Sequence, residues 1–300
     1  MKLKRLSALI PVLMLPLGLY LGYRAFSEHS PAEIAASVTA IPPARLALAL
    51  ACVAGSYLCL TGFDALALRY VGRSLAYRRV ALTSFVSLSI GHNVGVAALS
   101  SGALRYRFYS GYGLNAVEVA KIILFCGITV GLGLMALGGL VLSLWPDLAH
   151  ELIGVTPAAA RAIGFFCLAL AGGYVLIAWK VRRPLNLRGH RVGLPTAGVA
   201  AAQVAVGTAN FACVAAALHQ LMAGAASYPQ ATAAYVLGNV TSLLSHVPGG
   251  LGVLEFVIAS LVAGNVAGAL IAFRILYFFV PLLLGSLLLG GAELVRWRAG

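Results

Sequence analysis

Long apolar runs separated by short charged loops are the strongest constraint on how this chain can fold. Hydrophobic residues make up 61% of its 300 residues and charged residues only 10%. Because a helix that crosses a bilayer needs about 20 apolar residues, these runs predict an all-α, polytopic membrane protein. We expect one integral membrane domain over residues 1–300. Full spans are expected at about 6–26, 44–66, 117–144, 158–179, 195–222 and 268–292.

The N-terminus combines Lys2, Lys4 and Arg5 with an apolar run and therefore looks like a secretory signal peptide. The run is long, however, and no convincing small-residue cleavage site follows it. We interpret it as a retained first helix and count it as the first span.

The formal net charge of +13 is concentrated in the short loops. In a soluble protein it would suggest nucleic acid as a partner. Here the positive-inside rule and anionic lipid headgroups explain it better, so we expect no nucleic-acid partner. The basic loop at 180–194 and both termini are expected to be cytoplasmic.

Two apolar stretches, 80–101 and 231–265, contain Gly, His and Asn or Pro, which an ordinary lipid-facing helix does not hold. If 80–101 crossed the membrane, the basic loop at 180–194 would be external, against the positive-inside rule. We therefore predict that each stretch enters the membrane, breaks and returns to the same face. These are two re-entrant helical hairpins, one from each side, in addition to the six full spans.

The order span, hairpin, span occurs twice with opposite orientation, over 44–144 and 195–292. Inverted repeats whose interrupted helices meet near the middle of the membrane are typical of transporters. The alternative is eight plain spans with glycine-rich kinks, because the charge rule has exceptions.

Polar residues at the two breaks are the first candidates for a substrate-binding site. Ionisable groups at membrane depth are functional candidates, and the N-terminus of a half-helix suits a phosphate or a carboxylate. A histidine in an apolar stretch can equally be a satisfied core residue, and both interpretations stay open. The candidates are His92, Asn93, Asn239, His246, Gly249, Gly250 and Glu255.

A basic aromatic cluster follows the first hairpin and adds Arg105, Tyr106 and Arg107 to the candidates. It is either an anchor at the membrane interface or a clamp for a lipid phosphate, which guanidinium groups bind bidentately. Glu118 and Lys121 stand three residues apart on one helical face, as a local ion pair or as substrate contacts.

Glu255 and Arg274 cannot face lipid at low cost, so we expect them to pair across the core. The pair is either structural or in contact with substrate. Asp64 is interpreted more simply, as a charge that offsets the neighbouring Arg69.

Enzyme motifs are missing from the sequence. There is no phosphate-binding P-loop, no zinc-binding helix motif and no nucleophile elbow. The five cysteines show neither metal-ligand spacing nor a disulfide framework. We therefore predict that the protein is not an enzyme and uses neither a metal nor a cofactor.

Four motifs together resemble a known family. They are Gly91-His92-Asn93-Val94-Gly95, Leu99-Ser100-Ser101-Gly102-Ala103-Leu104-Arg105-Tyr106-Arg107-Phe108-Tyr109, Glu118-Val119-Ala120-Lys121 and Ser245-His246-Val247-Pro248-Gly249-Gly250-Leu251-Gly252-Val253-Leu254-Glu255. Over nearly the whole chain, the set resembles the transmembrane domain of lysylphosphatidylglycerol synthases and its stand-alone relatives. In the two-part synthases this domain is the flippase that moves aminoacylated phosphatidylglycerol across the inner membrane. No soluble aminoacyl-transfer domain is expected after Gly300, so the resemblance implies translocation and not synthesis. It also implies that the protein lies in the bacterial inner membrane.

The primary hypothesis is a flippase or transporter for an anionic or aminoacylated phospholipid, or for an isoprenoid lipid. One alternative is a lipid-binding accessory protein for a membrane lipid synthase. Another is an ion-coupled transporter of small solutes. Membrane lipids are the expected partners, with a lipid-modifying enzyme and further copies of the chain as additional candidates.

Overall fold

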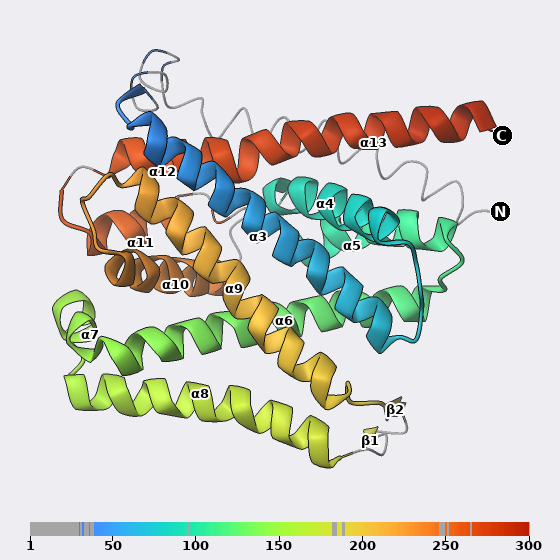
Figure 1. Cartoon of the computed structure of the whole chain (residues 1–300), viewed down its shortest axis with the longest axis horizontal. Coiled ribbons are helices and arrows are strands. Elements are labelled where there is room, and N and C mark those ends of the chain that lie inside the picture. Colours follow the sequence, from blue (N-terminus) through green and yellow to red (C-terminus); the bar gives the residue numbers. More distant parts are fainter. Residues whose placement is uncertain are drawn as a thin grey trace.

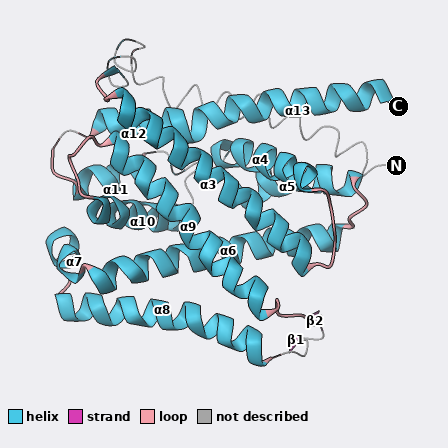
Figure 2. Ribbon diagram, in the orientation of Figure 1, coloured by secondary structure: helices cyan, strands magenta, loops and turns pink. Residues whose placement is uncertain are grey.

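The computed structural model describes residues 30–299, apart from 31, 33–35, 37–38, 95–96, 182–184, 188–189, 246–249, 251 and 265. The expected first span, 6–26, lies outside these residues. The described chain is almost entirely helical (Figure 2), which confirms the predicted all-α class.

Five helical segments within the described chain are long and apolar enough to cross a membrane. They agree with the five expected spans after the first one. Their bounds are α3 (Pro43–Tyr70), α6 (Ala116–Leu144), α8 (Pro157–Lys180), α9 (Ala197–Leu221) and a last segment composed of α12 (Ala267–Arg274), η2 (Ile275–Phe279) and α13 (Val280–Ala299).

Four shorter helices form two packed pairs in place of further spans. The first pair is α4 (Tyr77–Val94) with α5 (Ala97–Gly111), and the second is α10 (Tyr228–Ser245) with α11 (Val253–Leu261). Figure 1 shows the first pair toward the right of the molecule and the second pair at the opposite end.

Both outer ends of the α4–α5 pair lie at the end of the molecule where α3 stops and α6 starts. Tyr70 stacks on Phe125 with ring centroids 5.3 Å apart, and Arg73 pairs with Glu118 at 2.8 Å. Because only residues 71–76 and 112–115 link the pair to these spans, the chain enters and returns on one side. This is the path expected for a re-entrant hairpin.

The first pair is longer than expected. Its arms have 18 and 15 residues, against the predicted arms of about 10 residues within 80–101. As a result, Arg105 and Arg107 lie inside α5, and their predicted position directly after the hairpin is wrong. The inverted relation between 44–144 and 195–292 stays a prediction.

Two loops contain regular structure that the sequence analysis did not predict. Helix α7 (Pro146–Ile153) starts at a proline, carries Asp147 in its first turn and ends at Gly154, whose φ of 71° favours glycine. In the basic loop, β1 (Leu185–Leu187) and β2 (His190–Val192) form an antiparallel pair.

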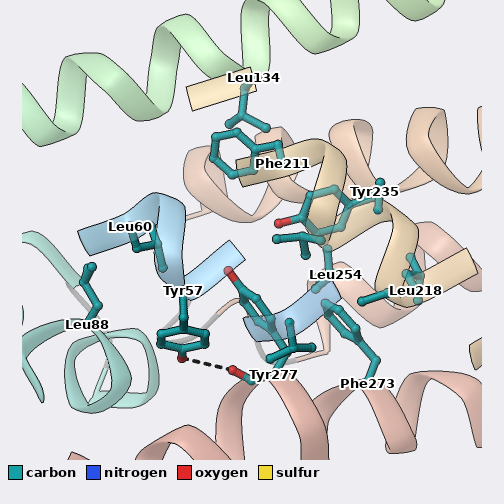
Figure 3. Close-up of a cluster of buried hydrophobic side chains, with 14 of the residues drawn as sticks. Tyr57, Leu60, Leu88, Leu134, Phe211, Leu218, Tyr235, Leu254, Phe273 and Tyr277 are labelled. Atoms are coloured by element: carbon teal, nitrogen blue, oxygen red, sulfur yellow. Dashed lines mark hydrogen bonds between the residues drawn. The ribbon is translucent and has the colours of Figure 1, made fainter. Parts of the chain in front are cut away.

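Helices α6 and α9 cross at a point where two glycines bring the backbones together. A Cβ atom added to Gly133 would meet the carbonyl carbon of Gly207 at 2.4 Å. Small residues allow this close approach between helices in a membrane. Beside the crossing lies an aromatic core (Figure 3), in which Phe211, Tyr235 and Tyr277 come from three different segments.

The Gly133→Ala variant is expected to lower the free energy of unfolding by about 1–3 kcal/mol, because its methyl group forces the two backbones apart. Gly131→Ala is the matched control, since no atom lies within 4 Å of a Cβ at that position. Unfolding in mixed micelles measures both variants. Equal stability of the two variants would contradict the close crossing.

Membrane sidedness is testable with single cysteines at Ser110, Glu151 and Ala225, in a chain whose five native cysteines are replaced. In spheroplasts, a membrane-impermeant maleimide is expected to label positions 151 and 225 but not 110. Labelling of position 110 from outside would favour eight plain spans.

Candidate functional site

The break in the last spanning segment, at η2, is where both helix pairs meet. Arg274, just before η2, contacts the second pair. Phe278, within η2, contacts the first pair through its backbone carbonyl. The irregular segment therefore links two hairpins that come from opposite ends of the molecule (Figure 1).

At the second pair, the start of α11 is bound to Arg274. Gly252 has a φ of 78°, and its N–H donates to Glu255 Oε2 at 2.9 Å, which caps the helix. Arg274 Nη2 donates to Glu255 Oε2 at 2.9 Å and to Gly250 O at 3.0 Å, and Arg274 Nε donates to Glu255 Oε1. The guanidinium carbon also lies 4.5 Å from the centre of the Phe278 ring. The pair predicted between Glu255 and Arg274 is thus confirmed.

At the first pair, the end of α4 contacts η2. Asn93 Nδ2 donates to Ser89 O at 2.8 Å and to Phe278 O at 3.2 Å. The His92 ring is stacked on Tyr277 and tilted against Phe278, in each case with centroids 6.5 Å apart. His92 Nδ1 is buried and has no hydrogen-bond partner among the described residues. A buried, unpaired ring nitrogen is a candidate contact for a ligand.

Pro281 explains why the helix is irregular at this point. Proline has no N–H to donate to the carbonyl of Tyr277, and its ring clashes with that carbonyl in a regular helix. The Val280 N–H bonds instead to Ile275 O, five residues back. Tyr57 OH, from α3, donates to the Tyr277 carbonyl at 3.2 Å (Figure 3). Pro281 was the sequence signal for this break, and the sequence analysis missed it.

A polar network ties η2 to α3 and α9 as well. Ser56 Oγ donates to Asn210 Oδ1 at 2.7 Å, and the Tyr277 OH lies 3.1 Å from Ser56 Oγ. Ser56 and Asn210 are almost completely buried. These hydrogen bonds satisfy polar groups for which the bilayer offers no water.

A second charged group lies between α3 and the first helix pair. Arg105 Nε and Nη2 donate to the two oxygens of Asp64 at 2.9 and 2.8 Å. Tyr109 OH and Ser84 Oγ donate to the same carboxylate at 2.9 and 2.8 Å. Arg105 Nη1 also donates to Ser101 Oγ at 3.1 Å. The carboxylate therefore holds both helices of the pair against α3.

The interpretation of Asp64 as a charge that only offsets Arg69 is wrong, because its partner is Arg105. Arg107 also has a carboxylate partner, since its Nη2 donates to Glu293 Oε2 at 3.0 Å. Tyr106 packs, half-buried, against the main core. The basic aromatic cluster is therefore connected to the protein interior.

The expected local pair between Glu118 and Lys121 does not form. Glu118 accepts from the N–H of Asn115 as the cap of α6, and its carboxylate pairs with Arg73. The hydrogen bond to this carboxylate raises the pKa of Arg73. Lys121 is exposed.

The remaining candidates are less informative. Asn239 Nδ2 donates to the Tyr235 hydroxyl at 3.1 Å, within α10. His246 and Gly249 lie outside the described residues. In the described part of the chain, no group of three or more His, Cys, Asp or Glu residues could hold a metal ion.

No protein-family model matches the chain. Two known proteins are similar over most of its length. Uncharacterized protein slr0712 of Synechocystis sp. is 34% identical over 273 residues, which cover 89% of this chain and 85% of that protein. Inner membrane protein YbhN of Escherichia coli is 30% identical over 250 residues, which cover 80% of this chain and 78% of that protein. The chain belongs to the YbhN family.

Membership of the YbhN family supports the predicted inner-membrane location, together with the five apolar helices. Neither relative's name mentions lysylphosphatidylglycerol. The resemblance to the synthases therefore stays a prediction.

In this YbhN-family chain, Arg105→Leu is expected to lower the free energy of unfolding by about 3–5 kcal/mol, because it leaves a buried carboxylate unpaired. The double variant Asp64→Leu/Arg105→Leu removes both charges and should recover about half of that loss or more. Unfolding in mixed micelles measures both variants.

Glu118→Gln is the control for that experiment. It breaks the pair with the half-exposed Arg73 and is expected to change the free energy of unfolding little, because solvent screens an exposed pair. A loss for Arg105→Leu no larger than that for Glu118→Gln would contradict a structural role of the buried pair.

Proposed function

We propose that this YbhN-family protein is a non-enzymatic lipid flippase of the inner membrane. Its proposed substrate is a lipid with an anionic or aminoacylated headgroup, built on a phospholipid or an isoprenoid. The observation that carries the proposal is that both short helix pairs contact one broken spanning segment. Interrupted helices that meet inside a bundle form the substrate sites of many transporters.

The groups at this meeting point suit a polar headgroup. Irregular backbone at membrane depth must be buried in protein or line a wet cavity. Here the guanidinium of Arg274, the carboxylate of Glu255 and the ring nitrogens of His92 come from three different helices around η2. A headgroup could contact these groups while its acyl chains stay in the bilayer. The resemblance to a flippase domain supports a lipid over a small solute.

The proposal is tested in vesicles that contain the purified protein and a fluorescent phosphatidylglycerol, whose outer-leaflet fraction is bleached chemically. His92→Ala is expected to slow lipid movement roughly tenfold, the effect of one lost hydrogen bond to a charged group. His150→Ala is the matched control, because His150 is exposed in α7.

Equal rates for His92→Ala and His150→Ala would contradict the assigned site. If the wild-type protein binds the lipid but moves none in pure vesicles, the transport proposal fails and an accessory role is favoured. If it takes up small solutes at a rate independent of the headgroup, a solute transporter is favoured.

A further inference from the structure

The Asp64–Arg105 and Glu255–Arg274 pairs differ in how completely they are enclosed. In the Asp64–Arg105 pair the side chains of Arg105 and Asp64 are 3% and 0% exposed. In the Glu255–Arg274 pair the side chains of Arg274 and Glu255 are 9% and 27% exposed. The Glu255 side chain is therefore partly exposed, whereas that of Asp64 is completely enclosed.

Arg274 has contacts that would hold its guanidinium in place without Glu255. Its Nη2 donates to Gly250 O at 3.0 Å, and its guanidinium lies over the Phe278 ring. A guanidinium that is nine-tenths buried and oriented by other groups is pre-organised for a planar, bidentate anion.

Glu255 likewise has a second partner. Its Oε2 accepts from the N–H of Gly252 at the start of α11, at 2.9 Å. If the Glu255 carboxylate turned toward solvent, it would break its hydrogen bonds to Arg274 and could keep its hydrogen bond to the Gly252 N–H. The α11 helix would then keep its N-terminal cap, while the guanidinium of Arg274 would exchange its carboxylate partner for another anion.

We propose that Arg274 is a phosphate-binding site and that Glu255 is its internal competitor. In this arrangement the Glu255 carboxylate occupies the guanidinium until a phosphate group replaces it. Phosphate oxygens match the guanidinium in the same bidentate geometry as the carboxylate. The inference rests on the proposed function, because it names the group of the lipid that the protein recognises.

The Asp64–Arg105 pair shows why exchange is confined to one of the two pairs. Asp64 accepts from Tyr109 and Ser84 in addition to Arg105, so its departure would leave several buried donors unpaired. Departure of Glu255 from Arg274 would break only the carboxylate–guanidinium hydrogen bonds, which a phosphate would replace.

Binding of dioctanoyl phosphatidylglycerol to the full-length protein in detergent, measured by calorimetry, tests the exchange. Glu255→Gln is expected to tighten binding about tenfold, because glutamine keeps the cap on Gly252 but removes the competing charge. Arg274→Gln is expected to weaken binding at least about tenfold. Arg274→Lys should fall between Arg274→Gln and the wild type, since it keeps the charge and loses the bidentate contact.

Glu118→Gln is a closely matched control. Glu118 caps α6 through Asn115 and pairs bidentately with Arg73, as Glu255 does with Gly252 and Arg274. This variant is expected to bind the probe with wild-type affinity. Melting temperatures of all variants show which of them are folded and can be compared.

Weaker or unchanged binding in a folded Glu255→Gln variant would overturn the exchange, and the pair would then be structural. Dioctanoylglycerol, which lacks phosphate, should not bind, and its binding with the affinity of the phospholipid would also overturn the proposal. Inorganic phosphate is the third probe. Its binding with phospholipid affinity would assign the site to free phosphate, and weaker binding would assign it to a lipid headgroup.

Failure of this inference and failure of the proposed function give different results. If the pair governs phosphate binding but no lipid moves in vesicles, the flippase is refuted and the phosphate site stands. If lipid moves but Glu255→Gln and Arg274→Gln bind the probe like the wild type, the flippase stands and the phosphate site is refuted.

Discussion

Pro281 removes the regular helical hydrogen bond to the Tyr277 carbonyl inside the last spanning segment, and the arrangement of the interior depends on how that carbonyl is satisfied. In a bilayer no water can bond to it, so a protein group must. Tyr57 supplies the hydrogen bond to Tyr277 O, and Asn93 supplies one to the next carbonyl. The broken helix thereby brings α3 and the tip of the first helix pair to the same place.

Two of the ion pairs that hold the helix pairs against full-length segments have their charges arranged in opposite ways. In the first pair the hairpin carries the cation, Arg105, and the span carries the anion, Asp64. In the second pair the hairpin carries the anion, Glu255, and the last span carries the cation, Arg274. The Asp64–Arg105 pair is fully enclosed, whereas the Glu255 side chain of the other pair is partly exposed. The difference suits a structural role for the first pair and an exchangeable contact for the second.

The sequence predicted the positions of the helices well and most of the side-chain partners poorly. Apolar length and loop charge predicted the five described spans and the two short pairs, because both are local properties of the chain. Partners such as Asp64 and Arg105 are separated by 41 residues, and no local pattern identified them. The Glu255–Arg274 pair was found because two charges in apolar surroundings must compensate each other.

The sequence by itself determined that this chain is a helical membrane protein with two interrupted, polar stretches, since the bilayer admits few other folds for such apolar runs. Only the tertiary structure decided which polar groups meet, because pairing depends on how distant helices rotate and cross. The close glycine contact between α6 and α9 and the irregular turn at η2 belong to that tertiary arrangement. In the folded chain, Arg105 is buried against Asp64, and Arg274 and His92 lie at the candidate site.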